Sequence, residues 1–151
     1  MSQIGVIFCY DKKVKGFSFI EILLVIAIVA IVAAAVTPFL SNFVLRNNFD
    51  ITRDQVLSTL RKAQSYAMDK KDSQTWGVCL TGNNIRLYSG SCASPIFSED
   101  FVKSSNVNLS GLSDTTFNLR GEPSAALNIT VSSVLDSASI TVNTVGRINV
   151  N

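Results

Sequence analysis

The sequence predicts an α+β protein in which a long N-terminal helix precedes an antiparallel β-sheet domain. The first observation behind this prediction is an apolar run from Ile22 to Val36 that contains no polar side chain. The second is a change from helical spacing to a period of two at Gln74, after which short alternating segments follow one another. A chain of 151 residues has room for one domain and a membrane segment.

Residues 17–40 are expected to form a membrane-spanning helix. At roughly 1.5 Å per residue this segment is about 36 Å long, which is enough to cross a hydrocarbon core of about 30 Å. Lys12, Lys13 and Lys15 precede it, so the N-terminal side is expected in the cytoplasm. Glu21 lies just inside the apolar segment, where a carboxylate is costly and by default indicates a function.

The order Lys15-Gly16-Phe17-Ser18-Phe19-Ile20-Glu21, followed by the apolar run and Pro38, resembles the signal of type IV pilins and type II secretion pseudopilins. The resemblance implies that residues 1–16 are a leader, which a prepilin peptidase removes by cutting between Gly16 and Phe17. It also implies N-methylation of Phe17 and an assembly role for Glu21, the fifth residue of the processed chain. The alternative is an ordinary signal anchor with an incidental glutamate.

The charge of the processed chain differs from that of the full sequence. The leader removes three of the 13 bases and one of the 11 acids, which leaves ten of each over residues 17–151. The net basicity therefore belongs to the leader and indicates nothing about partners.

Residues 41–73 are expected to continue the helix in amphipathic form. One stripe repeats at alternating spacings of four and three, and it comprises Phe49, Arg53, Val56, Leu60, Ala63 and Ala67, widened by Leu57 and Met68. The basic residues Lys70 and Lys71 near the end suit the negative pole of the helix dipole.

Residues 74–151 are expected to form a β-rich periplasmic domain. A hairpin is predicted from a strand at 75–80, a turn at 81–84 and a return strand at 85–88. The segment 90–100 is expected to be a loop. The further strand candidates are 107–109, 115–119, 127–134, 138–143 and 147–150, of which 127–132 alternates strictly and predicts one buried face.

The expected membrane orientation and the expected cleavage after Gly16 place the three cysteines in different compartments. Cys9 leaves with the leader, whereas Cys79 and Cys92 would lie in the oxidising periplasm, where they are expected to pair. Closing the loop between them would stabilise the fold by about 3 kcal/mol in the chain-entropy model. Two buried thiols are the alternative.

The sequence argues against catalysis. It contains no histidine, so a histidine triad, general base or metal ligand is excluded. Two cysteines without clustered acids make a poor zinc site, and no glycine-rich phosphate loop is present. We therefore expect no enzyme activity, no cofactor and no metal.

Two C-terminal segments refine the resemblance. Residues 117–121 (Phe-Asn-Leu-Arg-Gly) and 145–150 (Val-Gly-Arg-Ile-Asn-Val) are similar to the F-x-x-x-G segment and the terminal glycine-arginine strand of the family that contains type II secretion protein H and the fimbrial T minor pilins (GspH/FimT-like). Some fimbrial T members bind DNA through G-R-x-R. Here only Arg147 matches, because Asn149 stands at the second arginine position, so Arg147 is a weak candidate DNA contact.

The resemblance implies a minor pseudopilin of the type II secretion system: a single-pass protein of the bacterial inner membrane with a periplasmic C-terminal domain. Its expected partners are the other subunits of the fibre, the prepilin peptidase and N-methyltransferase, and the inner-membrane assembly platform. The alternatives are a minor pilin of a type IV pilus, with nucleic acid as a further partner, and a membrane-anchored periplasmic binding domain.

Overall fold

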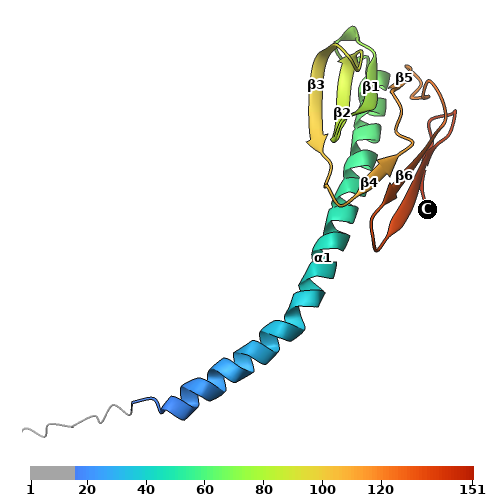
Figure 1. Ribbon diagram of the computed structural model, residues 1–151. Coiled ribbons are helices and arrows are strands. Elements are labelled where there is room, and N and C mark those ends of the chain that lie inside the picture. The colour runs from blue at the N-terminus through green and yellow to red at the C-terminus, as the bar shows by residue number, and fades with distance from the viewer. Residues whose placement is uncertain (1–15) are drawn as a thin grey trace, which may run out of the picture. The chain divides into compact units, whose positions relative to one another are not determined.

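A helix and two β-sheets make up the described part of the chain, which covers residues 16–151 of a computed structural model; the side chains of residues 36–38 are left out of the description (Figure 1). The chain divides into two compact units at Pro38, and the second unit is Phe39–Asn151. The expected leader, apart from Gly16, lies outside the described residues. The α+β class, with the long helix first and antiparallel sheets after it, is confirmed.

Helix α1 covers Phe19–Met68 and includes a stretch that is long and apolar enough to cross a membrane. Its described side chains before Pro38 are all exposed. Past Asn48 the pattern changes to one buried stripe. The helix ends earlier than the expected residue 73, because Lys70 adopts a left-handed conformation (φ 50°) and a short 3-10 turn, Lys71–Ser73, follows.

The first sheet is antiparallel, with strand order β3-β2-β1-β5. Its strands are β1 (Trp76–Thr81), β2 (Asn84–Gly90), β3 (Pro95–Val102) and β5 (Thr115–Phe117). The predicted hairpin is present: β1 and β2 pair from Trp76↔Ser89 to Thr81↔Asn84, with Gly82 and Asn83 in the turn. Gly82 has a φ of +59°, which is the conformation that the glycine-asparagine turn sequence favours.

The expectation of a loop over residues 90–100 is wrong, because β3 begins at Pro95 and pairs with the whole length of β2. The strand has no simple alternation because two acids, Glu99 and Asp100, are adjacent and point to opposite faces. Each acid finds a cation on its own face: Lys62 of α1 for Glu99 and Arg86 of β2 for Asp100. These long-range partners allow charged residues in a strand whose sequence alone indicates a loop.

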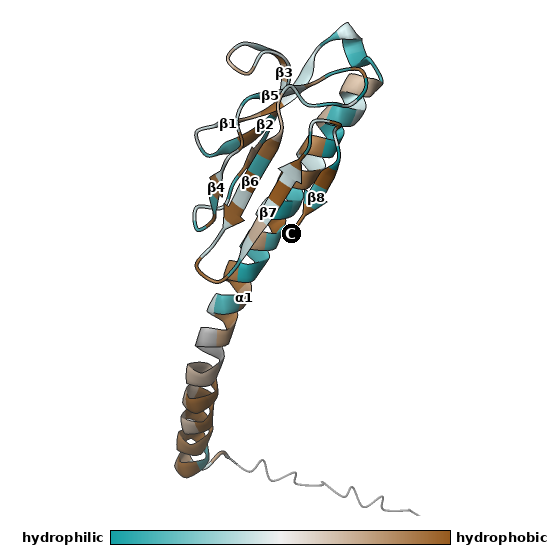
Figure 2. Ribbon diagram, turned by 90° about the vertical axis from the view of Figure 1, so that its right-hand side faces the viewer, coloured by the Kyte–Doolittle hydropathy of each residue, from teal (hydrophilic) through white to brown (hydrophobic). Residues whose placement is uncertain are grey.

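The second sheet has the order β4-β6-β7-β8 and is also antiparallel. Its strands are β4 (Asn108–Ser110), β6 (Leu127–Ser132), β7 (Ser137–Val142) and β8 (Ile148–Val150). The alternation predicted for β6 is confirmed, since Leu127, Ile129 and Val131 are buried while Asn128 and Thr130 are exposed. Figure 2 shows the same alternation as brown and pale or teal bands.

The core lies where the C-terminal half of α1 meets both sheets (Figure 1). The predicted helical stripe is buried except at Arg53, which is half-buried. Of the two residues expected to widen it, Leu57 is half-buried and Met68 is exposed. Thr52 and Thr59 are buried without being predicted, and each hydroxyl donates to the carbonyl oxygen four residues earlier. The strands of the two sheets contribute these buried side chains to the apolar core: Trp76, Val78, Ile85, Leu87, Phe117, Leu127, Ile129, Val131, Ile140 and Val142.

The side-chain amide of Gln64 joins α1 to two distant turns. Its Nε2 donates to the carbonyl oxygens of Gly121 (2.7 Å) and Gly146 (2.8 Å). Both glycines have positive φ, and a Cβ on Gly146 would lie 2.1 Å from the Gly121 oxygen. The two segments that carry the family resemblance at the C-terminus therefore meet at one helical residue, and glycine is required there by close backbone approach.

We expect Gly146→Ala to lower the free energy of unfolding by about 3 kcal/mol, since it combines left-handed strain with overlap at a backbone carbonyl. Gly82→Ala is the matched control. Its φ is also positive (+59°), but its Cβ would meet no atom within 4 Å, so we expect only about 1 kcal/mol. Urea denaturation of the purified protein in detergent measures both, and equal losses would contradict the role given to the Gly121 contact.

Candidate assembly site

The expected cleavage point lies in non-helical chain just ahead of α1. Gly16, Phe17 and Ser18 are not helical, and the Phe17 side chain is 80% exposed. The Ser18 carbonyl oxygen accepts the first helical bonds, from the amides of Glu21 (3.0 Å) and Ile22 (3.3 Å). The peptide bond between Gly16 and Phe17 is therefore free of secondary structure and open to an enzyme.

The glycine at the expected cut is not required by the fold of the described chain. A Cβ built on Gly16 meets no atom within 4 Å, and its φ is outside the left-handed range. This contrasts with Gly146, where a side chain would strike backbone. If glycine is required at position 16, the requirement would therefore come from an enzyme that binds this segment and not from the fold.

Glu21 lies in the first turn of α1, on the exposed surface of an apolar segment. Its neighbours along one side of the helix form a shallow hollow with it, and they are Phe17, Ile22, Val25 and Ile26. Within residues 16–151 no ion pair involves Glu21, and the sequence holds no base between Phe17 and Leu45. The positive end of the helix dipole favours a carboxylate in the first turn, but the site still lacks a full positive charge.

Cys79 and Cys92 form a disulfide, as the sequence analysis expects, with Cα atoms 6.3 Å apart. The bridge lies on the face of the first sheet that points away from α1, because the alternate residues Val78 and Leu80 contribute to the core. It links β1 to the turn between β2 and β3.

The Asp114 carboxylate lies within 4.8 Å of both sulfurs, although the sequence predicts no acids clustered near the cysteines. Sulfurs joined in a disulfide are not thiolates, and zinc requires thiolate ligands. The carboxylate instead accepts a hydrogen bond from the Tyr88 hydroxyl. Burial, and then this bond, raise the pKa of Tyr88 above its usual range.

Tyr88 also covers Gly77 on the neighbouring strand. A Cβ on Gly77 would lie 2.6 Å from the tyrosine oxygen, so glycine makes room for the ring. Beside them, Arg86 binds Asp100 through two bonds of 2.7 and 2.8 Å and donates to the Cys92 carbonyl oxygen (3.4 Å). The guanidinium lowers the pKa of Asp100. These groups form a satisfied polar layer around the disulfide.

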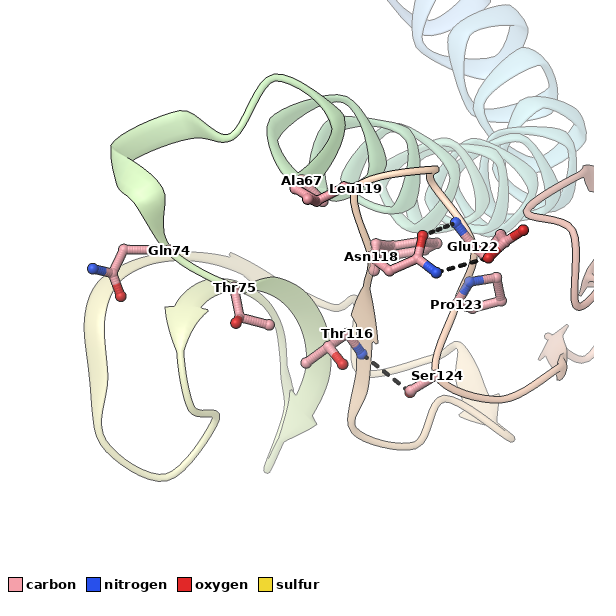
Figure 3. A pocket seen from close by; sticks show the side chains of 10 residues that line it. Ala67, Gln74, Thr75, Thr116, Asn118, Leu119, Glu122, Pro123 and Ser124 are labelled. Carbon is pink, nitrogen blue, oxygen red and sulfur yellow. Dashed lines mark hydrogen bonds between the residues drawn. The ribbon is translucent and has the colours of Figure 1, made fainter.

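The segment that resembles F-x-x-x-G borders a hollow of about 360 Å³ beside the edge strand β5 (Figure 3). Asn118 organises it: its Oδ1 accepts from the Glu122 amide (3.0 Å) and its Nδ2 donates to the Glu122 carboxylate (2.7 Å). The Thr116 amide approaches the Ser124 hydroxyl (3.4 Å). The polar groups around the hollow thus bond mostly to one another and maintain the turn.

Arg147, the candidate DNA contact, is exposed in the turn between β7 and β8. Its backbone amide donates to the Asn143 side chain (2.7 Å). The nearby contact between Gly121 and Gly146 brings the adjacent residue Arg120 into the same region, also exposed. In residues 16–151 neither arginine forms an ion pair.

Comparison with known families supports the interpretation of the N-terminus. Residues 11–37 match the family described as the prokaryotic N-terminal methylation motif. The match includes the expected cut, Glu21 and the apolar run, so the chain carries the N-terminal motif of type IV pilin-like proteins. The motif and the length and apolar composition of α1 are consistent with membrane anchoring. No curated protein and no solved structure matches the chain.

Two features of the β domain were not predicted from the sequence: the Tyr88–Asp114 bond and the bonds from Gln64 to Gly121 and Gly146. Asp114 follows Tyr88 by 26 residues, and Gly146 follows Gln64 by 82. No local pattern connects residues at such separations. A glycine opposite an aromatic residue in adjacent strands is the one sequence signal that could have located Tyr88.

The free energy of unfolding is expected to fall as the pH rises above about 10, the ordinary pKa of tyrosine. Because the pKa of Tyr88 is raised in the fold, the unfolded chain loses this proton first, so the stabilisation is complete below that pH and is lost above it. Denaturation from pH 8 to 11 measures the slope. Tyr88→Phe should flatten the slope relative to the wild type, and an unchanged slope in Tyr88→Phe would disprove the assignment.

Intact-mass and N-terminal peptide spectra of the protein purified from its host should show a chain that begins at methylated Phe17. Gly16→Leu should retain the leader, because a bulky side chain fits the chain's own fold but not the peptidase. An intact Met1 in the wild type would refute the processing site. So would a cut after the small residues 33–35, where a cleavable secretory signal peptide would be processed.

Proposed function

We propose that the protein is a minor pseudopilin of the type II secretion system, processed by the prepilin peptidase and assembled into a periplasmic fibre. The observation that carries this proposal is the N-terminal methylation motif, in which Glu21 forms no ion pair within residues 16–151 and lies beside an exposed, non-helical Gly16–Phe17 bond. The role is assembly and not catalysis.

The mechanism of assembly follows from the charge of Glu21. A carboxylate in hydrocarbon costs several kcal/mol unless it is neutralised or paired. Cleavage after Gly16 would create a new cation, the amine of Phe17, next to the same hollow. Pairing of this amine in one subunit with Glu21 of its neighbour would satisfy both charges and fix the axial step between subunits.

Two features of the β domain favour a minor subunit of the GspH/FimT-like kind. The C-terminal segments that resemble this family converge on Gln64, whose amide bonds both Gly121 and Gly146. The family is also expected to pack a long helix on two sheets, which is the arrangement found in residues 39–151. The inner-membrane assembly platform and other pseudopilins are the partners that this role implies.

A minor pilin of a type IV pilus, with or without DNA uptake, is the second candidate. From Gln74 onward the chain has four bases and five acids, and DNA affinity depends largely on neutralising phosphates. Arg86 is engaged by Asp100, and Lys103 by the Val107 carbonyl. Arg120 and Arg147 are the two bases left, so the charge distribution favours secretion over DNA binding. A membrane-anchored binding domain is the weakest candidate.

We expect Glu21→Val to leave membrane insertion and cleavage after Gly16 intact but to reduce co-purification with the other fibre subunits by at least about tenfold. The reason is that an ion pair worth more than about 1.4 kcal/mol is lost, and each such step is tenfold in binding. Co-purification from detergent-solubilised membranes, together with complementation of a deletion strain, measures the effect.

Ile22→Val is the matched control, since it changes the adjacent residue of the same hollow without changing charge. It should assemble like the wild type. If Glu21→Val also assembles and complements like the wild type, pairing is not the role of this glutamate.

A further inference from the structure

Three side chains that can bind metal ions meet on the outer face of the first sheet. Cys79 lies in β1, Cys92 in the turn between β2 and β3, and Asp114 just before β5. The two sulfurs and one carboxylate oxygen all lie within 4.8 Å of one another. Cys79 is buried, Cys92 is half-buried and Asp114 is exposed, so the group is open to solvent on one side.

Hydrogen bonds from neighbouring hydroxyl groups support this cluster. The Tyr88 hydroxyl donates to Oδ1 of Asp114, and a carboxylate has further lone pairs for a second partner. The Thr81 hydroxyl lies 3.8 Å from each of the two sulfurs. In metalloproteins the carboxylates that bind an ion are themselves hydrogen-bonded, which fixes their orientation. The fold therefore orients Asp114 in the way that a metal ligand is oriented.

The two cysteines pass through two covalent forms. Every newly made chain carries them as thiols, and thiols persist wherever a reducing compartment maintains them. Closure of the disulfide removes two electrons and two protons, which an external disulfide accepts as it becomes a dithiol. Before closure, or after a dithiol has reversed it, both sulfurs can become thiolates. The thiolate is the form of cysteine that binds metals.

We propose that the reduced β domain binds one thiophilic divalent cation of the Zn²⁺ class through Cys79, Cys92 and Asp114. Thiolates bind Zn²⁺ at about 2.3 Å, so two of them in a tetrahedral site lie about 3.8 Å apart. The Cα atoms of the cysteines are 6.3 Å apart, and rotation of the side chains reaches that separation without moving the backbone. The fourth ligand is water, because the exposed side of the cluster faces solvent.

The ion and the disulfide exclude each other because they use the same sulfurs. Binding releases the two thiol protons to solvent, and two thiolates, one carboxylate and one dication leave the site with a charge of −1. Mg²⁺ and Ca²⁺ are disfavoured, since they require oxygen ligands. The bound ion fastens the turn between β2 and β3 to β1, as the disulfide does. The inference goes beyond the proposed function and requires neither cleavage after Gly16 nor pairing by Glu21.

The test uses the full chain in detergent, with Cys9→Ser in every sample so that two cysteines remain. A trialkylphosphine reduces the disulfide and is itself oxidised to the phosphine oxide with oxygen from water; the excess is removed without air. Co²⁺ is titrated into the reduced chain, because its visible absorption reports tetrahedral ligation by thiolates. Zn²⁺ is then added to displace it.

Asp114→Asn is the diagnostic variant. It removes the charge of the carboxylate and keeps an oxygen that can accept the hydrogen bond from Tyr88, so the fold is retained. Asp69→Asn is the matched control, because it makes the same substitution at an exposed acid just past the end of α1.

We expect the reduced chain to bind one Co²⁺, the oxidised chain to bind none, and Zn²⁺ to displace the Co²⁺. Loss of an outer partner of a metal ligand lowers affinity about 10–100-fold, so Asp114→Asn should weaken binding by at least about tenfold and Asp69→Asn should leave it unchanged. Zn²⁺ at ten times its Kd should slow closure of the disulfide by oxidised glutathione about tenfold, because only free thiolates attack.

Equal affinity in Asp114→Asn and the unsubstituted chain overturns the proposal, and so does the absence of binding to the reduced chain. One ion for two chains also overturns it, since four thiolates from two copies would then hold the ion. Near-ultraviolet circular dichroism of the buried Trp76 reports folding. If reduction unfolds the chain, the ion must refold it, and a chain that stays unfolded with saturating Zn²⁺ overturns the proposal.

Discussion

One helix has to suit two environments, an apolar one along its first part and a protein core in water along its second. The rest of the structure depends on this constraint. Before Pro38 the helix exposes apolar side chains on all sides, whereas from Phe49 to Ala67 it buries a single stripe. The first pattern suits lipid or the helices of neighbouring subunits. The second requires a water-soluble cover, and the two sheets provide it. Glu21 is the exception that gives the apolar part a specific partner.

The features predicted well from sequence are those encoded by neighbours in the chain. The apolar run, the helical stripe and the strict alternation of β6 are periodic, and a period is visible in any short window. The cleavage signal is likewise a local string, from Lys15 to Glu21. The fold class, the order of the elements and the first hairpin could therefore be predicted from the sequence. The N-terminal signal is supported by the match of residues 11–37 to the methylation motif.

The features that were missed depend on distant partners. Strand β3 carries two adjacent acids, and only Lys62 and Arg86 make them acceptable there. Gln64 has the sequence position of a solvated helical residue, yet it is the bond between α1 and two turns. Neither contact follows from propensity or spacing, because each partner is remote in sequence. Asp114 near the disulfide is a further case.

The order of the strands along the chain has a consequence for how the domain is inherited and engineered. Strand β4, which belongs to the second sheet, precedes β5 in the chain, although β5 belongs to the first sheet. The two sheets are thus interleaved and cannot be exchanged as separate modules, although no hydrogen bond of the strand ladders joins them. A hybrid of two such proteins with its junction in β4 or β5 would combine half-sheets from different parents. Junctions that preserve both sheets lie before Trp76, in the turn where α1 ends.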